Sequence, residues 1–400
     1  MRGDRALRVL TWLMFLVTAM TTSVVGVLIP DVARTYGLSL AQAGGLQYAV
    51  MAGVALAGLL LGGLADRLGR RATVLAGLAL FTAAASLIPL SRGLPPLLAL
   101  LFVSGLAIGL FKTGALALIG DLSDSSASHA RSMNVVEGVF AVGAIIGPMV
   151  VARLLANGLP WTALYGLAGA LSLSLLAVAA LVRFPPVQHA GAGRGAGVLA
   201  VIAVARAPRA LGYAGCVFLY VGVETAVYVW MPSLLAAQGA KAPLPGAYAL
   251  STFFVLRALG RFLGAWALER LGWTRVLAAC SAAILVCFVG ALAGGLAAAS
   301  TLLPLSGLFM SVLYPTLNAK AINGFPPARQ GAAAGFMLFA TCLSATLSPL
   351  AIGATSDAFG GPRAGFVLAA GMALALAVAL AVLHARQALG AVARNQFDRD

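Results

Sequence analysis

The chain has 400 residues, of which 61% are hydrophobic and only 9% are charged, and its mean hydropathy is +1.00. A soluble protein of this size needs roughly a quarter of its residues charged to stay solvated, so a soluble globular domain is excluded. The formal net charge of +15 would suggest nucleic-acid binding in a soluble protein. In a membrane protein it marks orientation, so no nucleic-acid partner is expected.

Apolar windows follow one another along the chain, separated by glycine, proline and charged residues. Each is long enough to cross a ~30 Å hydrocarbon core as a helix, which satisfies its own backbone hydrogen bonds there. The predicted spans are residues 8–30, 41–64, 72–91, 95–121, 131–155, 161–184, 208–232, 246–268, 274–296, 300–323, 329–356 and 363–386. The sequence therefore predicts an all-α membrane protein of twelve transmembrane helices in a lipid bilayer.

Basic residues are distributed unevenly between the two sets of span ends. One set carries most of the arginines, whereas the other holds only Arg34, Arg92, Arg153, Lys241 and Arg363. Because basic loops stay in the cytoplasm, both termini are predicted to be cytoplasmic. The expected location is the cell inner membrane. The apolar run near the N-terminus lacks the small-residue cleavage pattern of a secretory signal, so it is interpreted as the first span.

A glycine-rich, basic segment, residues 185–207, is predicted to be a cytoplasmic linker. It divides the chain into residues 1–184 and 208–400, each with six spans. Asp66-Arg67-Leu68-Gly69 follows the second span, and Glu269-Arg270-Leu271-Gly272 follows the eighth. This parallel repeat is typical of transporters with two related bundles. We therefore expect two pseudo-symmetric six-helix bundles.

The stretch from Gly62 to Arg71, with sequence GGLADRLGRR, resembles the signature loop between helices 2 and 3 of the major facilitator superfamily. The resemblance covers essentially the whole chain and implies that family's fold. It also implies a latch, in which Asp66 faces the N-terminus of helix 11 while Arg67 and Arg70 hold the loop on the cytoplasmic side. Glu269 and Arg270, at the repeated positions, are assigned to the same gating function. A basic turn that only fixes topology is the alternative.

Two ionisable residues within spans are the sharpest functional signal, because charges are costly in the bilayer and usually face a cavity or a partner. They are Lys112 in the fourth span and Glu224 in the seventh. The resemblance implies that helices 1, 4, 7 and 10 line a central cavity, so both are predicted to bind substrate there. Glu224 is the candidate proton-coupling site, since burial moves a carboxyl pKa towards neutrality. A structural pairing of Glu224 with Lys112 is the alternative.

A second group of charges lies towards the cytoplasmic side of spans five and eight. We predict that Glu137 and Arg261 form a gate that is made and broken as the bundles rock. Arg257, one turn deeper, is predicted to bind an anionic group of the substrate. The alternative is that both arginines extend to the membrane interface.

Aromatic and polar side chains complete the predicted cavity lining, because aromatic faces with a few polar groups suit a small polar ligand. These candidates are Tyr220, Tyr228, Trp230, Tyr314 and Asn318, with Thr18, Thr21 and Thr22 in the first span. Individually, each is as readily explained by packing. Pro315 predicts a kink in the tenth span. Gly138, Gly143 and Gly147 in the fifth span predict close packing against a neighbouring helix.

Within the superfamily, two stretches are similar to the fucose–proton symporter group: Gly109 to Thr113, and Tyr220 to Glu224. That group tends to carry glutamate where this chain has Lys112, which favours an anionic substrate over a sugar. The sequence predicts a secondary transporter, not an enzyme, that moves a sugar or organic anion with protons by symport. A proton-driven multidrug efflux carrier is the alternative, and a scramblase or sensor is less favoured. We expect a monomer without cofactor or metal, because no nucleotide-binding loop or ligand cluster occurs.

Overall fold

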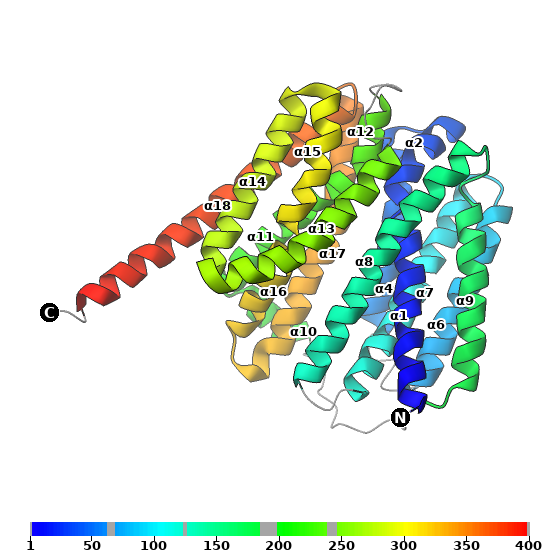
Figure 1. Cartoon of the computed structure of the whole chain (residues 1–400), viewed down its shortest axis with the longest axis horizontal. Helices are drawn as coiled ribbons and strands as arrows, with labels where there is room; N and C mark the ends of the chain where they lie inside the picture. Colours follow the sequence, from blue (N-terminus) through cyan, green and yellow to red (C-terminus); the bar gives the residue numbers. More distant parts are fainter. Residues whose placement is uncertain (1, 62–68, 123–125, 185–197, 238–245, 398–400) are drawn as a thin grey trace. The chain divides into compact units, whose positions relative to one another are not determined.

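A computed structural model describes residues 2–61, 69–122, 126–184, 198–237 and 246–397 (Figure 1). Within these ranges the chain is helical and contains no β-strand. It forms two compact units, Met1–Gly193 with Gly246–Ser251, and Arg194–Pro245 with Thr252–Asp400. We call them the N-terminal and the C-terminal unit.

The helices of the N-terminal unit follow the predicted spans with small shifts. They are α1 Arg2–Thr22, α2 Val25–Tyr36, α3 Leu40–Ala43, α4 Gly45–Leu61, α6 Arg70–Leu87 with the 3₁₀ turn η1 Ile88–Leu90, α7 Leu94–Asp121, α8 Ser126–Ala156 and α9 Ala163–Leu181. The first span extends beyond its predicted end at Pro30, because α2 continues to Tyr36. Gly37, with φ 63°, closes α2 by donating its backbone N–H to Ala33.

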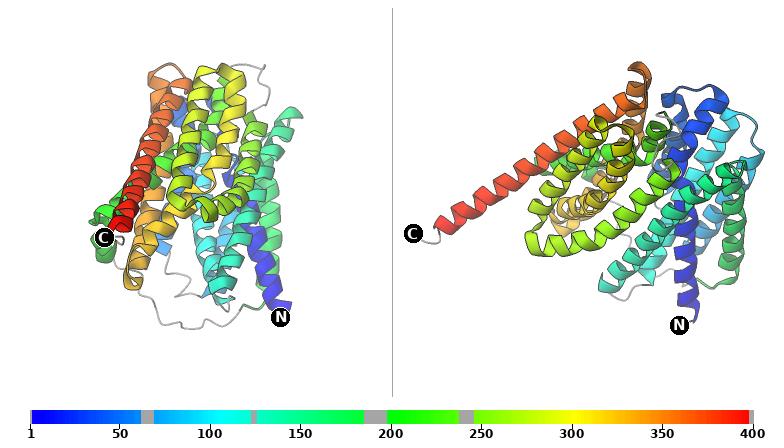
Figure 2. Two further views of the ribbon diagram at one scale, coloured as in Figure 1. Left: turned by 60° about the vertical axis from the view of Figure 1, so that its left-hand side comes forward. Right: turned by 45° about the horizontal axis from the view of Figure 1, so that its top comes forward.

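The C-terminal unit contains the remaining helices (Figure 2). They are α10 Val198–Ala205, α11 Pro208–Thr225, the π-helical η2 Ala226–Trp230, α12 Met231–Ala237, α13 Gly246–Leu271, α14 Trp273–Ala293, α15 Gly295–Met310, α16 Leu313–Asn323, α17 Pro327–Ala358 and α18 Pro362–Phe397. The first residues of α13, Gly246–Ser251, group with the N-terminal unit.

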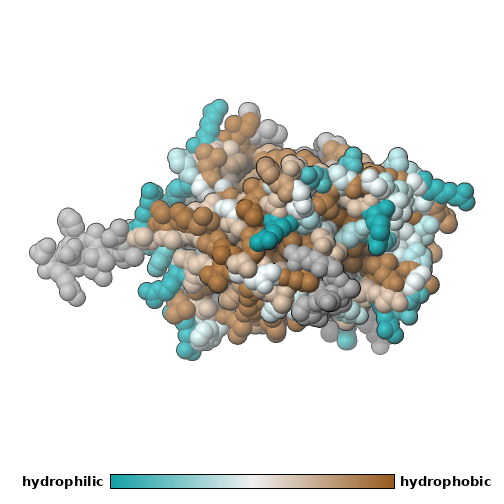
Figure 3. Space-filling model, turned by 90° about the horizontal axis from the view of Figure 1, so that it is seen from above, coloured by the Kyte–Doolittle hydropathy of each residue, from teal (hydrophilic) through white to brown (hydrophobic). Residues whose placement is uncertain are grey.

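Eleven helical segments in the described part of the chain are long and apolar enough to cross a membrane. The predicted eighth span corresponds to α13, which has 26 residues and is therefore long enough. Arg257 and Arg261 lower its hydropathy below that of the other spans. Large apolar side chains such as Leu181 (85% exposed), Phe262 (78%) and Phe359 (77%) lie on the surface, and hydrophobic atoms cover much of the face in Figure 3. Exposed apolar surface on this scale suits contact with lipid.

Small residues bring the helices of the N-terminal unit close together. In α8, Gly143 lies against Leu16 and Ala19 of α1, and Gly147 lies against Met20. A Cβ at either glycine would collide with the backbone of α1, so the predicted packing is confirmed for these two positions. Gly138 has open space beside it and does not take part.

The repeated tetrapeptides end in the same backbone conformation. Gly69 precedes α6 with φ 86° and ψ 158°, and Gly272 precedes α14 with φ 79° and ψ 145°. A positive φ of this kind is accessible to glycine at little cost and strained for other residues. The sequence repeat therefore corresponds to a structural repeat at the start of α6 and α14.

Candidate functional site

The seventh span is interrupted beside its acidic residue. After α11 the backbone passes through the π-helical η2 before continuing as α12. Pro232 explains the interruption, because it has no N–H to donate to the carbonyl of Tyr228 and its ring crowds that carbonyl. Glu224, in the last turn of α11, is 8% exposed. Single π turns often occur at functional sites, and here one lies next to a buried carboxylate.

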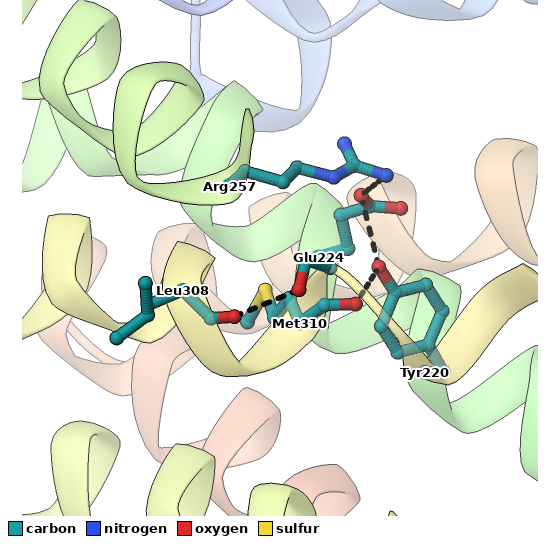
Figure 4. Close-up of polar contacts among 6 residues, drawn as sticks. Tyr220, Glu224, Arg257, Leu308 and Met310 are labelled. Atoms are coloured by element: carbon teal, nitrogen blue, oxygen red, sulfur yellow. Dashed lines mark hydrogen bonds and ion pairs between the residues drawn. The ribbon is translucent and has the colours of Figure 1, made fainter. Parts of the chain in front are cut away.

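Glu224 forms an ion pair with Arg257 of α13 in the C-terminal unit (Figure 4). The Glu224 side chain is 10% exposed and the Arg257 side chain 22%. Glycines allow α13 to come close enough to α15 for this geometry. Gly260 lies against the carbonyl of Leu308 and the hydroxyl of Ser311, where a larger residue would not fit. A buried pair of this kind is stable only while both charges are present.

Tyr220 completes the cluster from one turn earlier on α11. Its hydroxyl lies 3.2 Å from Oε1 of Glu224 and 3.0 Å from the carbonyl oxygen of Met310 (Figure 4). Its side chain is 1% exposed. We call Tyr220, Glu224 and Arg257 the carboxylate cluster. Because its hydroxyl is buried and already donates within the protein, Tyr220 acts on Glu224 instead of presenting a free surface to a solute.

The tenth span breaks between α15 and α16, at Ser311 and Val312. The predicted kink at Pro315 is confirmed in kind, and its position has a simple cause: a proline disrupts the hydrogen bond to the residue four positions earlier, which is Ser311. Tyr314 follows the break, and its ring lies 6.2 Å from that of Tyr220. Asn318 donates from Nδ2 to the carbonyl of Tyr314 at 2.9 Å.

The other aromatic candidates of the seventh span lie within and beside the π turn. Trp230 is 1% exposed and donates its indole N–H to the carbonyl of Pro349 at 3.2 Å. This arrangement is typical of a buried packing residue with a satisfied polar atom. Tyr228 is only partly buried. It stays a candidate for contact with a solute.

Lys112 lies in α7 of the N-terminal unit between two aromatic rings. Its Nζ is 5.3 Å from the ring centre of Phe15 and 5.0 Å from that of Phe140. Glu137 of α8 is near enough for its charge to attract Lys112. Cation–π contacts stabilise the ammonium group by about 0.5–2 kcal/mol each without occupying its three donors. The site thus holds a positive charge in place inside the unit.

The threonines of the first span bond within their own helix. Thr18 donates to the carbonyl of Met14 at 2.7 Å, and Thr21 and Thr22 both donate to the carbonyl of Thr18 at 3.0 and 2.9 Å. Hydroxyls that bond back to the preceding turn compete with the helical backbone. The gap between α1 and α2 follows directly after them. These residues therefore shape the break in the first span.

The predicted gating residues divide into three groups. Asp66 and Arg67 lie outside the described residues. Arg70 pairs with Asp121, with Nε 2.9 Å from Oδ2, and so ties the start of α6 to the end of α7. Glu269 and Arg270 are exposed, and Arg270 lies over the ring of Trp266 at 5.2 Å.

The predicted Glu137–Arg261 gate joins residues of different units and stays a prediction. Glu137 is exposed, and Arg261 is partly buried.

Two features were missed in the sequence. Asp121, the partner of Arg70, ends the fourth span next to a polar run, which is the only signal that marked it. Gln47 of α4 is fully buried, and its amide has no hydrogen-bond partner among the described residues. An unpaired buried amide costs about 1–3 kcal/mol, so Gln47 is a position where a polar group is retained at a cost.

Comparison with known proteins agrees with this architecture. The sequence pattern of the Major Facilitator Superfamily matches residues 11–349. The L-fucose-proton symporter of Escherichia coli is 25% identical over 344 residues, which cover 78% of each chain. The 4-hydroxybenzoate transporter PcaK of Pseudomonas aeruginosa is 25% identical over 411 residues, covering 94% of this chain and 91% of the relative.

A crystal structure of the nucleoside transporter NupG superposes with a TM-score of 0.78 at 15% identity, covering 96% of this chain and 99% of that one. At this identity the likeness concerns the fold. The family match extends over most of the chain and coincides with the repeat and the helical spans. The chain belongs to the major facilitator superfamily, and it is a multi-pass membrane transporter with that family's fold of twelve helices in two six-helix bundles.

Proposed function

We propose that this protein is a proton-coupled importer of a small organic anion, working by alternating access. The observation that carries the proposal is the ion pair between Glu224 and Arg257. While Glu224 is ionised, its carboxylate occupies the guanidinium of Arg257. When Glu224 takes a proton, the pair loses its attraction and Arg257 becomes available to a carboxylate of the solute. Proton and anion then bind together, which is the requirement for symport.

Lys112 supports an anionic solute over a neutral sugar. Its ammonium group is held between Phe15 and Phe140, so a cation is maintained at a partly buried position of the N-terminal unit. A cation there attracts a carboxylate at the cost of little further ordering. The relatives fit this division, since one is named for 4-hydroxybenzoate, an aromatic carboxylate, and one for fucose with a proton. We assign the solute to the class of small carboxylates, with sugars second.

The orientation of the chain is part of the proposal. The bias of arginines towards one set of span ends supports two cytoplasmic termini, with residues 185–207 as the cytoplasmic linker between bundles 1–184 and 208–400. In a bacterial cell this corresponds to the inner membrane. Fusion of a reporter that is active only in the cytoplasm to Asp400 tests the assignment. Activity is expected, and a silent reporter on a stable fusion would reverse the topology.

Transport by proteoliposomes tests the function. Labelled 4-hydroxybenzoate and L-fucose serve as probes, with the lumen alkaline by about one pH unit. Because protonated benzoic acids cross bilayers unaided, protein-free liposomes provide the baseline. We expect carboxylate uptake above this baseline that a protonophore abolishes. Uptake of fucose instead would replace the solute class, and extrusion of a cationic dye with neither probe moved would favour the drug efflux alternative.

A further inference from the structure

The hydroxyl of Tyr220 has one proton and two acceptors within reach. Oε1 of Glu224 lies at 3.2 Å and the carbonyl oxygen of Met310 at 3.0 Å, as Figure 4 shows. A phenol donates a single hydrogen, so the two bonds compete. With Tyr220 only 1% exposed, bulk water offers no ready substitute for either acceptor. The division of the hydrogen between them therefore depends on the charge of Glu224.

Met310 is the last residue of α15, directly before the break in the tenth span. The last carbonyls of a helix have no donor within the helix, so they need partners from elsewhere. Tyr220 supplies one to Met310. Gly260 of α13 lies against the same turn, at Leu308 and Ser311, only three residues from Arg257. Both partners of Glu224 are thus mechanically close to the end of α15.

The surroundings of Glu224 leave few other groups to respond to its charge. Arg257, and at longer range Arg261, face the cluster from α13, while Tyr220 and Tyr228 share its own span. Tyr314 approaches Tyr220 from α16. From α17 and α18, the side chains beside Gly222 are Ser348 and Met372, which carry no charge. Protonation of Glu224 is therefore felt first by Arg257 and Tyr220.

We propose that Tyr220 is a positioning residue that links the protonation of Glu224 to the break in the tenth span. The inference rests on the proposed function, in which Glu224 takes the proton. An ionised carboxylate draws the hydroxyl hydrogen towards itself, because charge-assisted bonds are about twice as strong as neutral ones. A protonated Glu224 releases it to the carbonyl of Met310, and the end of α15 is held more firmly. Tyr220 keeps its own proton throughout, and the proton on Glu224 comes from water and returns to it.

Hydrogen exchange at one fixed pH tests the link, with E224Q standing in for the protonated carboxyl. The readout is the exchange of a peptide that covers Met310 to Tyr314, compared in wild type, E224Q, Y220F and the double variant. We expect E224Q to slow this exchange by a factor of about five, the effect of strengthening one hydrogen bond. Y220F should accelerate it, and the double variant should match Y220F.

Tyr165→Phe is the matched control, because Tyr165 is also buried and also donates to a backbone carbonyl, that of Thr21 at 3.4 Å in the N-terminal unit. It should leave the peptide unchanged. If E224Q slows exchange equally in the Y220F background, the link does not pass through Tyr220 and the inference fails. If E224Q does not fold, wild type and Y220F are compared at pH 6 and pH 8 after correction for intrinsic exchange, and equal responses overturn it.

Transport separates this inference from the proposed function. If E224Q still accumulates 4-hydroxybenzoate in response to a pH gradient, the proposed coupling site is wrong. If E224Q is uncoupled but its effect on the peptide persists without the Tyr220 hydroxyl, only the link is wrong.

Discussion

The guanidinium of Arg257 on α13 and the carboxylate of Glu224 on α11 form an ion pair inside the C-terminal unit. At 22% and 10% side-chain exposure, each charge depends on the other more than on water. A proton that neutralises Glu224 therefore changes the state of Arg257 as well. This dependence joins the chemistry of a proton to the binding of an anion.

Removal of one member of the pair should destabilise the protein more than removal of both. R257Q leaves a buried carboxylate without its counter-charge, which costs about 3 kcal/mol in sites of this kind. The double variant E224Q/R257Q should recover much of that loss. Thermal unfolding in detergent measures the cycle, with the exposed Arg270→Gln as control. Strictly additive effects of the two substitutions would show that the pair contributes nothing.

Lys112 should determine whether a carboxylate is transported. K112Q removes the cation and is expected to lower 4-hydroxybenzoate uptake at least about tenfold, the effect of losing one charge-assisted bond. K112R should retain most of the activity, because arginine also binds carboxylates and stacks on aromatic rings. Uptake by K112Q at the wild-type rate would remove Lys112 from the site.

The break in the tenth span should depend on Pro315. Pro315→Ala restores an N–H that can donate to the carbonyl of Ser311, so the helix is expected to become more continuous. Stability in detergent should rise by about 1 kcal/mol, while transport slows because the interruption is part of the moving element. Thermal unfolding and uptake are measured on the same preparation. A variant that is more stable and equally active would show that the break serves no transport step.

The ion pair between Arg70 and Asp121 should hold the cytoplasmic end of the N-terminal bundle together. The side chains are 11% and 23% exposed, so D121N is expected to lower the midpoint of thermal unfolding. Asp31 pairs with Arg34, whose side chain is 79% exposed, and D31N is the control with little expected effect. Equal effects of the two substitutions would contradict a specific role for Arg70.

Much of the fold could be predicted because the bilayer imposes strict rules on length and polarity. Residue periodicity was sufficient for the spans, and the Asp66 and Glu269 tetrapeptides revealed the repeat that Gly69 and Gly272 confirm in their backbone angles. Even Arg257 and Arg261, which lower the hydropathy of α13, did not hide the eighth span, since its length and position in the repeat remained visible.

Partnerships between side chains were harder to predict, because they depend on helix rotation and approach. The sequence did not indicate that Glu224 would pair with Arg257, which depends on the narrow contact at Gly260. Nor did it indicate that the hydroxyl of Tyr220 would reach Met310, 90 residues away. The position of the tenth-span break was predictable only to within one turn of Pro315.

The most direct test of the account is proton movement with solute in the absence of an imposed gradient. Proteoliposomes that contain a pH-sensitive dye receive external 4-hydroxybenzoate, and the response of protein-free liposomes is subtracted. Wild-type protein is predicted to acidify the lumen, while E224Q exchanges labelled for unlabelled solute at a substantial rate without acidification. If E224Q acidifies the lumen as wild type does, Glu224 does not carry the proton and the central claim is wrong.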